Sequence, residues 1–146
     1  MSIPYDSLPA DYKLFTHVDK EGNNLNVDIG RLLRDPKYTR LEVVALVITT
    51  QMVMDTLRNN AVNRDKVRSI LRNPRHIPPI TLLLDTNDNP PTYMLGDGHH
   101  RTVAFAAAQI ETIPARIVPR ALWAKYIVTG APQITQRELT DLPPRR

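Results

Sequence analysis

Residues 96–101 read Gly-Asp-Gly-His-His-Arg and carry the side chains of this sequence that are best suited to chemistry. Glycine lets the backbone approach a ligand closely and offer it N–H groups. Arg101 can bind phosphate oxygens with two parallel hydrogen bonds, and two histidines can donate hydrogen bonds or move protons near neutral pH. A helix that follows would add a partial positive charge. The segment predicts a phosphate site formed by Gly98, His99, His100 and Arg101.

Asp97 lies inside this segment and has more than one chemical use. A carboxylate beside a phosphate site can hold the Mg²⁺ that neutralises developing charge, or it can serve as a general base. An aspartate can equally cap a turn, and the histidines can then bind only loop carbonyls. Glu42 is a second carboxylate that folding could bring near. These alternatives stay open at the level of sequence.

The elements that must position this segment follow from hydrophobic patterning. Thr49 or Thr50 is suited to cap one helix, and Asn63 to cap the next. The strands over 80–85 and 92–95 are expected to form a hairpin. The sequence predicts an α+β fold, with strands over 41–48, 80–85, 92–95 and 113–118, helices over 51–59, 64–72, 102–109 and 121–128, and a short strand or helix near 25–33.

Length and composition are those of an ordinary globular protein. The chain has 146 residues, of which 42% are hydrophobic and 23% charged. We expect one domain over 1–146, with an N-terminal arm over 1–40, a core over 41–128 and a C-terminal tail over 129–146, of which 142–146 is expected to be loose. The absence of cysteine excludes disulfides, thiolate metal sites and a cysteine nucleophile. A net charge of +4 favours phosphate-bearing partners, although solubility alone can explain it.

No stretch of the sequence predicts contact with a membrane. Its apolar runs are far shorter than the roughly 20 residues of a membrane helix. The first residues lack a basic region followed by an apolar stretch, so we expect no signal peptide and a cytoplasmic protein. The sequence does not predict the oligomeric state.

Four stretches resemble a known superfamily in order and spacing. Residues 65–69 read Asp-Lys-Val-Arg-Ser, 77–80 read Ile-Pro-Pro-Ile, 93–101 end in His-Arg, and 111–118 read Glu-Thr-Ile-Pro-Ala-Arg-Ile-Val. Residues 65–118 thereby resemble the ParB/sulfiredoxin superfamily, and sulfiredoxins most closely. The resemblance implies a small mixed sheet flanked by helices. It also implies that His100 and Arg101 bind nucleotide phosphates and that Lys66 and Ser69 contact the nucleotide.

The sequence departs from sulfiredoxins at the residue before the His-Arg pair. Sulfiredoxins have their catalytic cysteine there, and this chain has His99, so reduction of a sulfinic acid by that route is excluded. The Asp-Gly-His-His-Arg segment instead resembles free serine kinases of the same superfamily, which transfer phosphate from ADP. ParB proteins bind CTP through a related loop, and other relatives are nucleases.

These observations lead to competing functional hypotheses. The first is a nucleotide-binding ATPase or phosphotransferase that uses ATP or ADP, with CTP as an alternative and Mg²⁺ on Asp97. In it Asp97, His99 and His100 are the catalytic residues, and Lys66, Ser69, Gly98, His100 and Arg101 bind phosphate. The second is a DNA-binding protein or metal-dependent nuclease of the ParB type, which the basic segment 64–75 favours. The third is a nucleotide sensor without catalysis.

Overall fold

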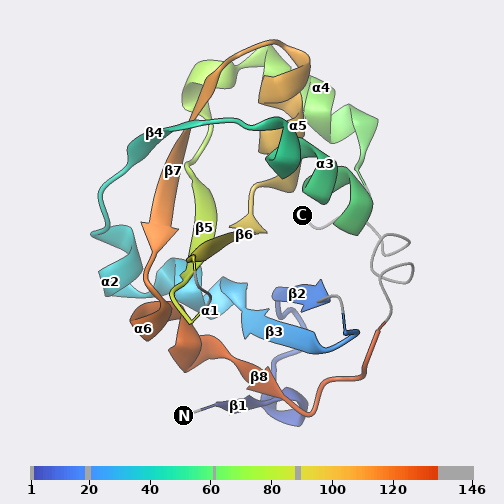
Figure 1. The fold of residues 1–146 in the computed structure, drawn as a ribbon, viewed down its shortest axis with the longest axis vertical. Helices are drawn as coiled ribbons and strands as arrows, with labels where there is room; N and C mark the ends of the chain where they lie inside the picture. The colour runs from blue at the N-terminus through green and yellow to red at the C-terminus, as the bar shows by residue number, and fades with distance from the viewer. Residues whose placement is uncertain (1, 19–20, 61, 88–89, 135–146) are drawn as a thin grey trace.

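The computed structural model describes residues 2–18, 21–60, 62–87 and 90–134, which fold around a four-stranded mixed sheet (Figure 1). Its strands lie in the order β4-β7-β5-β6. Strand β7 runs antiparallel to β4 and parallel to β5, and β5 and β6 form the predicted antiparallel hairpin. The α+β class is thereby confirmed. The strands are β4 (Val44–Val47), β5 (Ile80–Asp85), β6 (Thr92–Asp97) and β7 (Thr112–Val118).

Three helices pack on one face of this sheet. They are α3 (Thr50–Asn59), α4 (Arg64–Arg72) and α5 (His99–Ala107). Both predicted caps are confirmed. The Thr49 hydroxyl accepts the Met52 N–H at 3.2 Å, and the Asn63 side-chain oxygen accepts the Lys66 N–H at 3.1 Å. Such caps satisfy backbone donors that have no partner within the helix. The apolar side chains of this face include Met52, Ile70, Ile80, Phe105 and Ile113.

The N-terminal residues cover the opposite face and are part of the core. Strands β2 (Leu14–Val18) and β3 (Asn24–Asp28) form an antiparallel hairpin, and α1 (Ile29–Arg34) and α2 (Pro36–Thr39) follow. The region near 25–33, predicted as a strand or a helix, is therefore both in succession. The short α6 (Arg120–Trp123) packs with them. The remaining short elements are β1 (Ile3–Pro4), which pairs with β8 (Val128–Thr129), and the 3₁₀ turns η1 (Tyr5–Ser7), η2 (Pro74–His76) and η3 (Ala124–Tyr126).

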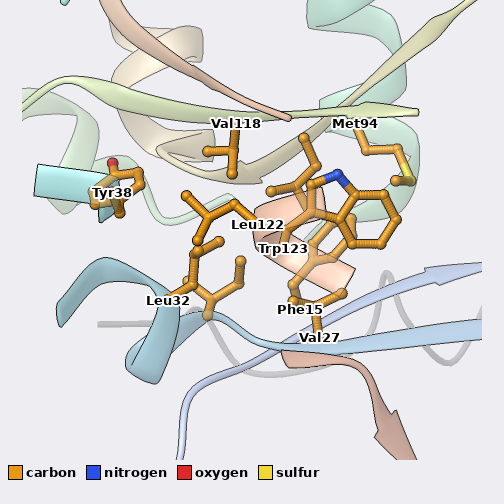
Figure 2. Packing of buried hydrophobic residues seen from close by; sticks show 10 residues of the cluster. Phe15, Val27, Leu32, Tyr38, Met94, Val118, Leu122 and Trp123 are labelled. Atoms are coloured by element: carbon orange, nitrogen blue, oxygen red, sulfur yellow. The ribbon is translucent and has the colours of Figure 1, made fainter. Parts of the chain in front are cut away.

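Trp123 is at the centre of this second cluster. Figure 2 shows its ring between Met94, which comes from the sheet, and Phe15, which comes from β2. The Trp123 side chain is fully buried, and its indole N–H donates to the Leu84 carbonyl at 3.0 Å. The ring is thus buried without an unsatisfied donor, as buried tryptophans usually are. Alternate side chains of the sheet supply the two faces, with Ile80 in one cluster and Leu83 in the other.

Two predicted elements differ from the structure. The buried strand predicted over 41–48 is the shorter β4, an edge strand on which Val47 is 62% exposed. The run of apolar residues predicted a strand that is buried on both faces. As an edge strand, β4 instead leaves part of its side chains exposed to solvent. The helix predicted over 121–128 ends at Trp123. The chain then passes through η3 into β8, because Val128 is drawn into pairing with β1.

The chain after β8 remains attached to the fold as far as Ile134. The Asn24 side chain accepts the Ile134 N–H at 2.8 Å and donates to its carbonyl at 3.1 Å. The rest of the predicted tail, including residues 142–146 that were expected to be loose, lies outside the described residues. None of the helices in the described ranges has the length and apolar character needed to cross a membrane.

Candidate functional site

Gly98 connects the end of β6 to the start of α5. Its φ is +105°, a left-handed conformation that glycine adopts without strain. A Cβ at this position would lie 2.4 Å from Cγ2 of Ile80 on β5. Helix α5 therefore begins at His99, and not at Thr102 as predicted, so the two histidines and Arg101 form its first turn and not a loop. The sequence contains no usual capping side chain at this point, and within the described residues none caps the helix.

Arg101 is held inside the protein by its own hydrogen bonds. One terminal nitrogen of the guanidinium donates to the carbonyls of Pro78 and Pro79 at 2.6 and 2.8 Å, and the other to Asp97 at 2.9 Å. Its side chain is only 13% exposed. The charge of Arg101 thus lies beside the first turn of α5. The guanidinium group itself is hydrogen-bonded to the loop that precedes β5. The sequence predicts a phosphate as the partner of this guanidinium, whereas its partners here are the two proline carbonyls and Asp97.

Asp97, the last residue of β6, binds two cations. One carboxylate oxygen accepts from the ammonium of Lys13 and the other from Arg101, both at 2.9 Å. Burial raises the pKa of Asp97, but the hydrogen bond and charge of Lys13, with the charges of Arg101 and His99, outweigh burial and leave the pKa below its usual value. Lys13 is not predictable from the sequence as a site residue, because it lies 84 positions from Asp97 in a segment without a recognisable motif.

The residues around Asp97 do not fit a magnesium cage. Both carboxylate oxygens already accept hydrogen bonds from cations, whereas Mg²⁺ requires oxygen ligands in octahedral geometry. In the described part of the chain there is no group of three or more acidic or histidine side chains that could hold a metal ion. The geometry supports Asp97 as the residue that holds Lys13 beside Arg101.

His100 joins the start of α5 to the start of α4. Its Nε2 accepts the backbone N–H of Asn63 at 3.0 Å, so the neutral ring carries its proton on Nδ1. Burial, with the nearby charge of Lys66, lowers the pKa of His100 and favours this neutral form. The structure thus brings the predicted residues Lys66 and His100 together, while Ser69 is exposed one turn further along α4.

His99, the first residue of α5, lines a cavity of about 320 Å³. The other walls come from α3, β2, β5, β6 and the end of β4. The sequence pointed to His99 but not to this cavity, because residues from six separate elements form it. Glu42 is not brought to the site. It is exposed and precedes β4, and strands β7 and β5 lie between β4 and Asp97 on β6.

Comparison of the sequence with protein-family models and with curated proteins finds no match. The chemistry of the site therefore has to be argued from its geometry. Three cationic side chains, Lys13, Lys66 and Arg101, lie around the first turn of α5, and the carboxylate of Asp97 bridges two of them, Lys13 and Arg101. Together with the partial positive charge of the helix N-terminus, this arrangement favours an anionic ligand.

Proposed function

We propose that this protein is a nucleotide-binding enzyme of the ParB/sulfiredoxin fold that hydrolyses or transfers a nucleotide phosphate at the start of α5. The main support is the geometry of Gly98, which has a left-handed backbone and lies against Ile80. Gly98 precedes α5, and among the described residues no side chain caps this helix. The first-turn N–H groups and the surrounding cations are the groups that bind phosphate oxygens in proteins. The mixed sheet with helices on both faces is compatible with that fold, which the stretches within 65–118 suggest.

In this proposal the protein contributes charge stabilisation and orientation. Water or an acceptor hydroxyl attacks the terminal phosphorus, the bond to the bridging oxygen breaks, and the shortened nucleotide leaves with that oxygen. Lys66 and the N-terminus of α5 stabilise the charge on the phosphoryl oxygens. His99 faces the cavity and accepts the proton of the nucleophile.

His100 and Asp97 have supporting roles in this proposal. His100 is a positioning residue, since its Nε2 is bound to the Asn63 N–H. Asp97 holds Lys13 and Arg101 in place. No step is assigned to a metal ion, because the carboxylate of Asp97 is already bound to both cations.

Calorimetric titration with ATP, ADP and CTP, with and without Mg²⁺, tests the binding step. Lys66→Met is expected to weaken nucleotide binding about tenfold to a hundredfold, the loss of a charge-assisted contact. Lys125→Met is the matched control, because it removes the same charge from η3, which packs with the opposite face of the sheet. Equal affinities for wild type and Lys66→Met, or no binding of any nucleotide by wild type, would contradict the proposal.

Release of phosphate or of a shortened nucleotide tests the catalytic step. His99→Gln is expected to lower kcat about a hundredfold while nucleotide affinity changes little, as for the loss of a general base. A binding-competent wild type that produces neither product would favour the nucleotide sensor.

One observation favours the alternative of a DNA-binding protein or nuclease. Arg64, Arg68 and Arg72 are exposed on α4 and follow one another at four-residue spacing, so they share one helix face. Such a stripe can contact consecutive phosphates of a nucleic acid. Anisotropy of labelled single- and double-stranded DNA tests this alternative. It would be supported by tight, salt-dependent binding that Arg68→Ala weakens and tripolyphosphate does not displace.

A further inference from the structure

The cavity beside His99 has the size of a small-molecule site. Its volume of about 320 Å³ is at the lower end of the range in which proteins enclose small ligands. Figure 1 shows α3, β6 and β2 surrounding the same region of the molecule. The described side chains that line the cavity are Phe15, Thr16, His17, Leu46, Thr49, Met52, Asp55, Thr56, Asn60, Leu82, Tyr93, Met94, Leu95 and His99.

The apolar walls of the cavity suit a flat ring. Met52 on α3 and Met94 on β6 both line it, and thioethers make favourable contacts with aromatic rings. Phe15 comes from β2, and Tyr93, which is 57% exposed, comes from β6. Aromatic side chains such as these can stack on a planar ligand.

The position of β6 adds hydrogen-bonding groups to these walls. Tyr93, Met94 and Leu95 are consecutive residues that all line the cavity. Successive residues of a strand face opposite sides of a sheet, so a cavity on one face would be lined by alternate residues only. The cavity therefore lies along the edge of β6, where both sides of the strand are reached. Within the described residues β6 pairs only with β5, so it is an edge strand. An edge strand presents backbone N–H and C=O groups outward, and these can bind the edge of a heterocycle.

The polar side chains on α3 already bond within the helix. The Thr49 hydroxyl accepts from Met52, the Thr56 hydroxyl donates to the Met52 carbonyl at 2.8 Å, and Asn60 donates to the Thr56 carbonyl at 3.3 Å. The α3 side of the cavity would therefore bind a ligand mainly through apolar contacts. His99 belongs both to this cavity and to the first turn of α5, so the cavity is continuous with the candidate phosphate site.

We propose that this cavity binds the base of a nucleotide whose phosphates lie at the N-terminus of α5. This inference rests on the proposed function and adds the place of the base to it. The ring enters between Met52 and Met94 and meets the edge of β6. The cavity and the helix terminus thus form two parts of one ligand site, one apolar and one cationic.

Two probes separate these parts, namely ATP and inorganic tripolyphosphate, which has the phosphates but no ring. Met52→Trp fills the cavity and is expected to raise the Kd for ATP at least tenfold, while the Kd for tripolyphosphate changes less than twofold. Met54→Trp is the matched control, since Met54 is 56% exposed and outside the lining. It should leave both affinities unchanged. Leu46→Trp, with Val47→Trp as control, repeats the test from β4 should Met52→Trp not fold.

The possible results are distinguishable. Weaker ATP binding with unchanged tripolyphosphate binding supports the inference. Unchanged ATP binding in both folded cavity variants overturns it while the proposed function stands. If a folded cavity variant binds neither ATP nor tripolyphosphate, the phosphates and not the base occupy the cavity, and the inference is overturned. Failure of wild type to bind either probe contradicts the proposed function, and the inference with it.

Discussion

Gly98 combines two requirements in one residue, a left-handed backbone and a close approach to a neighbouring strand. With φ at +105°, any other residue would be strained, and a Cβ would overlap the side chain of Ile80. The position of the first turn of α5 depends on both conditions. The glycine is therefore as important to the fold as it is to the candidate site.

Gly98→Ala is expected to lower the free energy of unfolding by about 2–5 kcal/mol, the sum of left-handed strain and overpacking. Gly22→Ala is the control, because Gly22 has a φ of +85° but nothing within 4 Å of an added Cβ. It should cost only about 1–2 kcal/mol from strain. Urea denaturation of both variants measures the difference. Equal losses would show that the Ile80 contact carries no energy.

At the scale of elements, His100 couples the starts of α4 and α5. Its Nε2 accepts the Asn63 N–H, so the bond exists only while the ring is neutral. Protonation would replace an acceptor by a donor facing that N–H. The relative position of the two helices at the candidate site is therefore sensitive to pH.

The folded state is expected to lose stability as the pH falls below about 6.5. Burial and the charge of Lys66 hold the pKa of His100 below its usual 6.5, so the unfolded chain takes up the proton first. The contribution of neutral His100 to the free energy of unfolding is complete above pH 6.5 and is lost as the pH falls through the pKa of His100 in the folded state. His100→Gln keeps an acceptor for Asn63 and should flatten the dependence of Tm on pH between 7.5 and 5.

The exposed His76 provides the control for this measurement. His76→Gln should retain the pH dependence of wild type, and NMR titration of the His100 ring should give a midpoint below 6.5. A His100→Gln curve that follows wild type would contradict the coupling.

At the scale of the whole molecule, the N-terminal segment and the sheet share one core. Leu32 of α1 is fully buried with Trp123 and Leu83, far from it in sequence. Figure 2 shows Leu32 pointing toward Leu122 and Val118, which belong to the C-terminal half of the chain. The ion pair of Lys13 with Asp97 links the same two parts beside the candidate site. We infer that removing the N-terminal segment would disrupt the core as well as the site.

Leu32→Ala is expected to lower the free energy of unfolding by about 2–5 kcal/mol, as for other buried leucines. Leu57→Ala is the matched control, because Leu57 is 48% exposed on α3, and its loss should stay within about 0.5 kcal/mol. Chemical denaturation gives both values. A small loss at Leu32 would mean that the N-terminal segment packs only loosely on the sheet.

Local features were predictable from the sequence because they depend on neighbouring residues. The cap of α3 by Thr49, the cap of α4 by Asn63 and the β5–β6 hairpin are all confirmed. Each arises from interactions within a few positions or across a short turn. The grouping of Gly98, His99, His100 and Arg101 followed for the same reason, since the four are consecutive.

Only the tertiary structure decided what surrounds these residues. Helix α5 begins at His99 because Gly98 meets Ile80 on another strand, and the fork of Arg101 is bound to the carbonyls of Pro78 and Pro79. Lys13 reaches Asp97 across 84 positions, and residues of six elements line the cavity beside His99. Hydrophobic periodicity shows which face of an element is buried but not what it packs against, and packing is what sets these distant contacts.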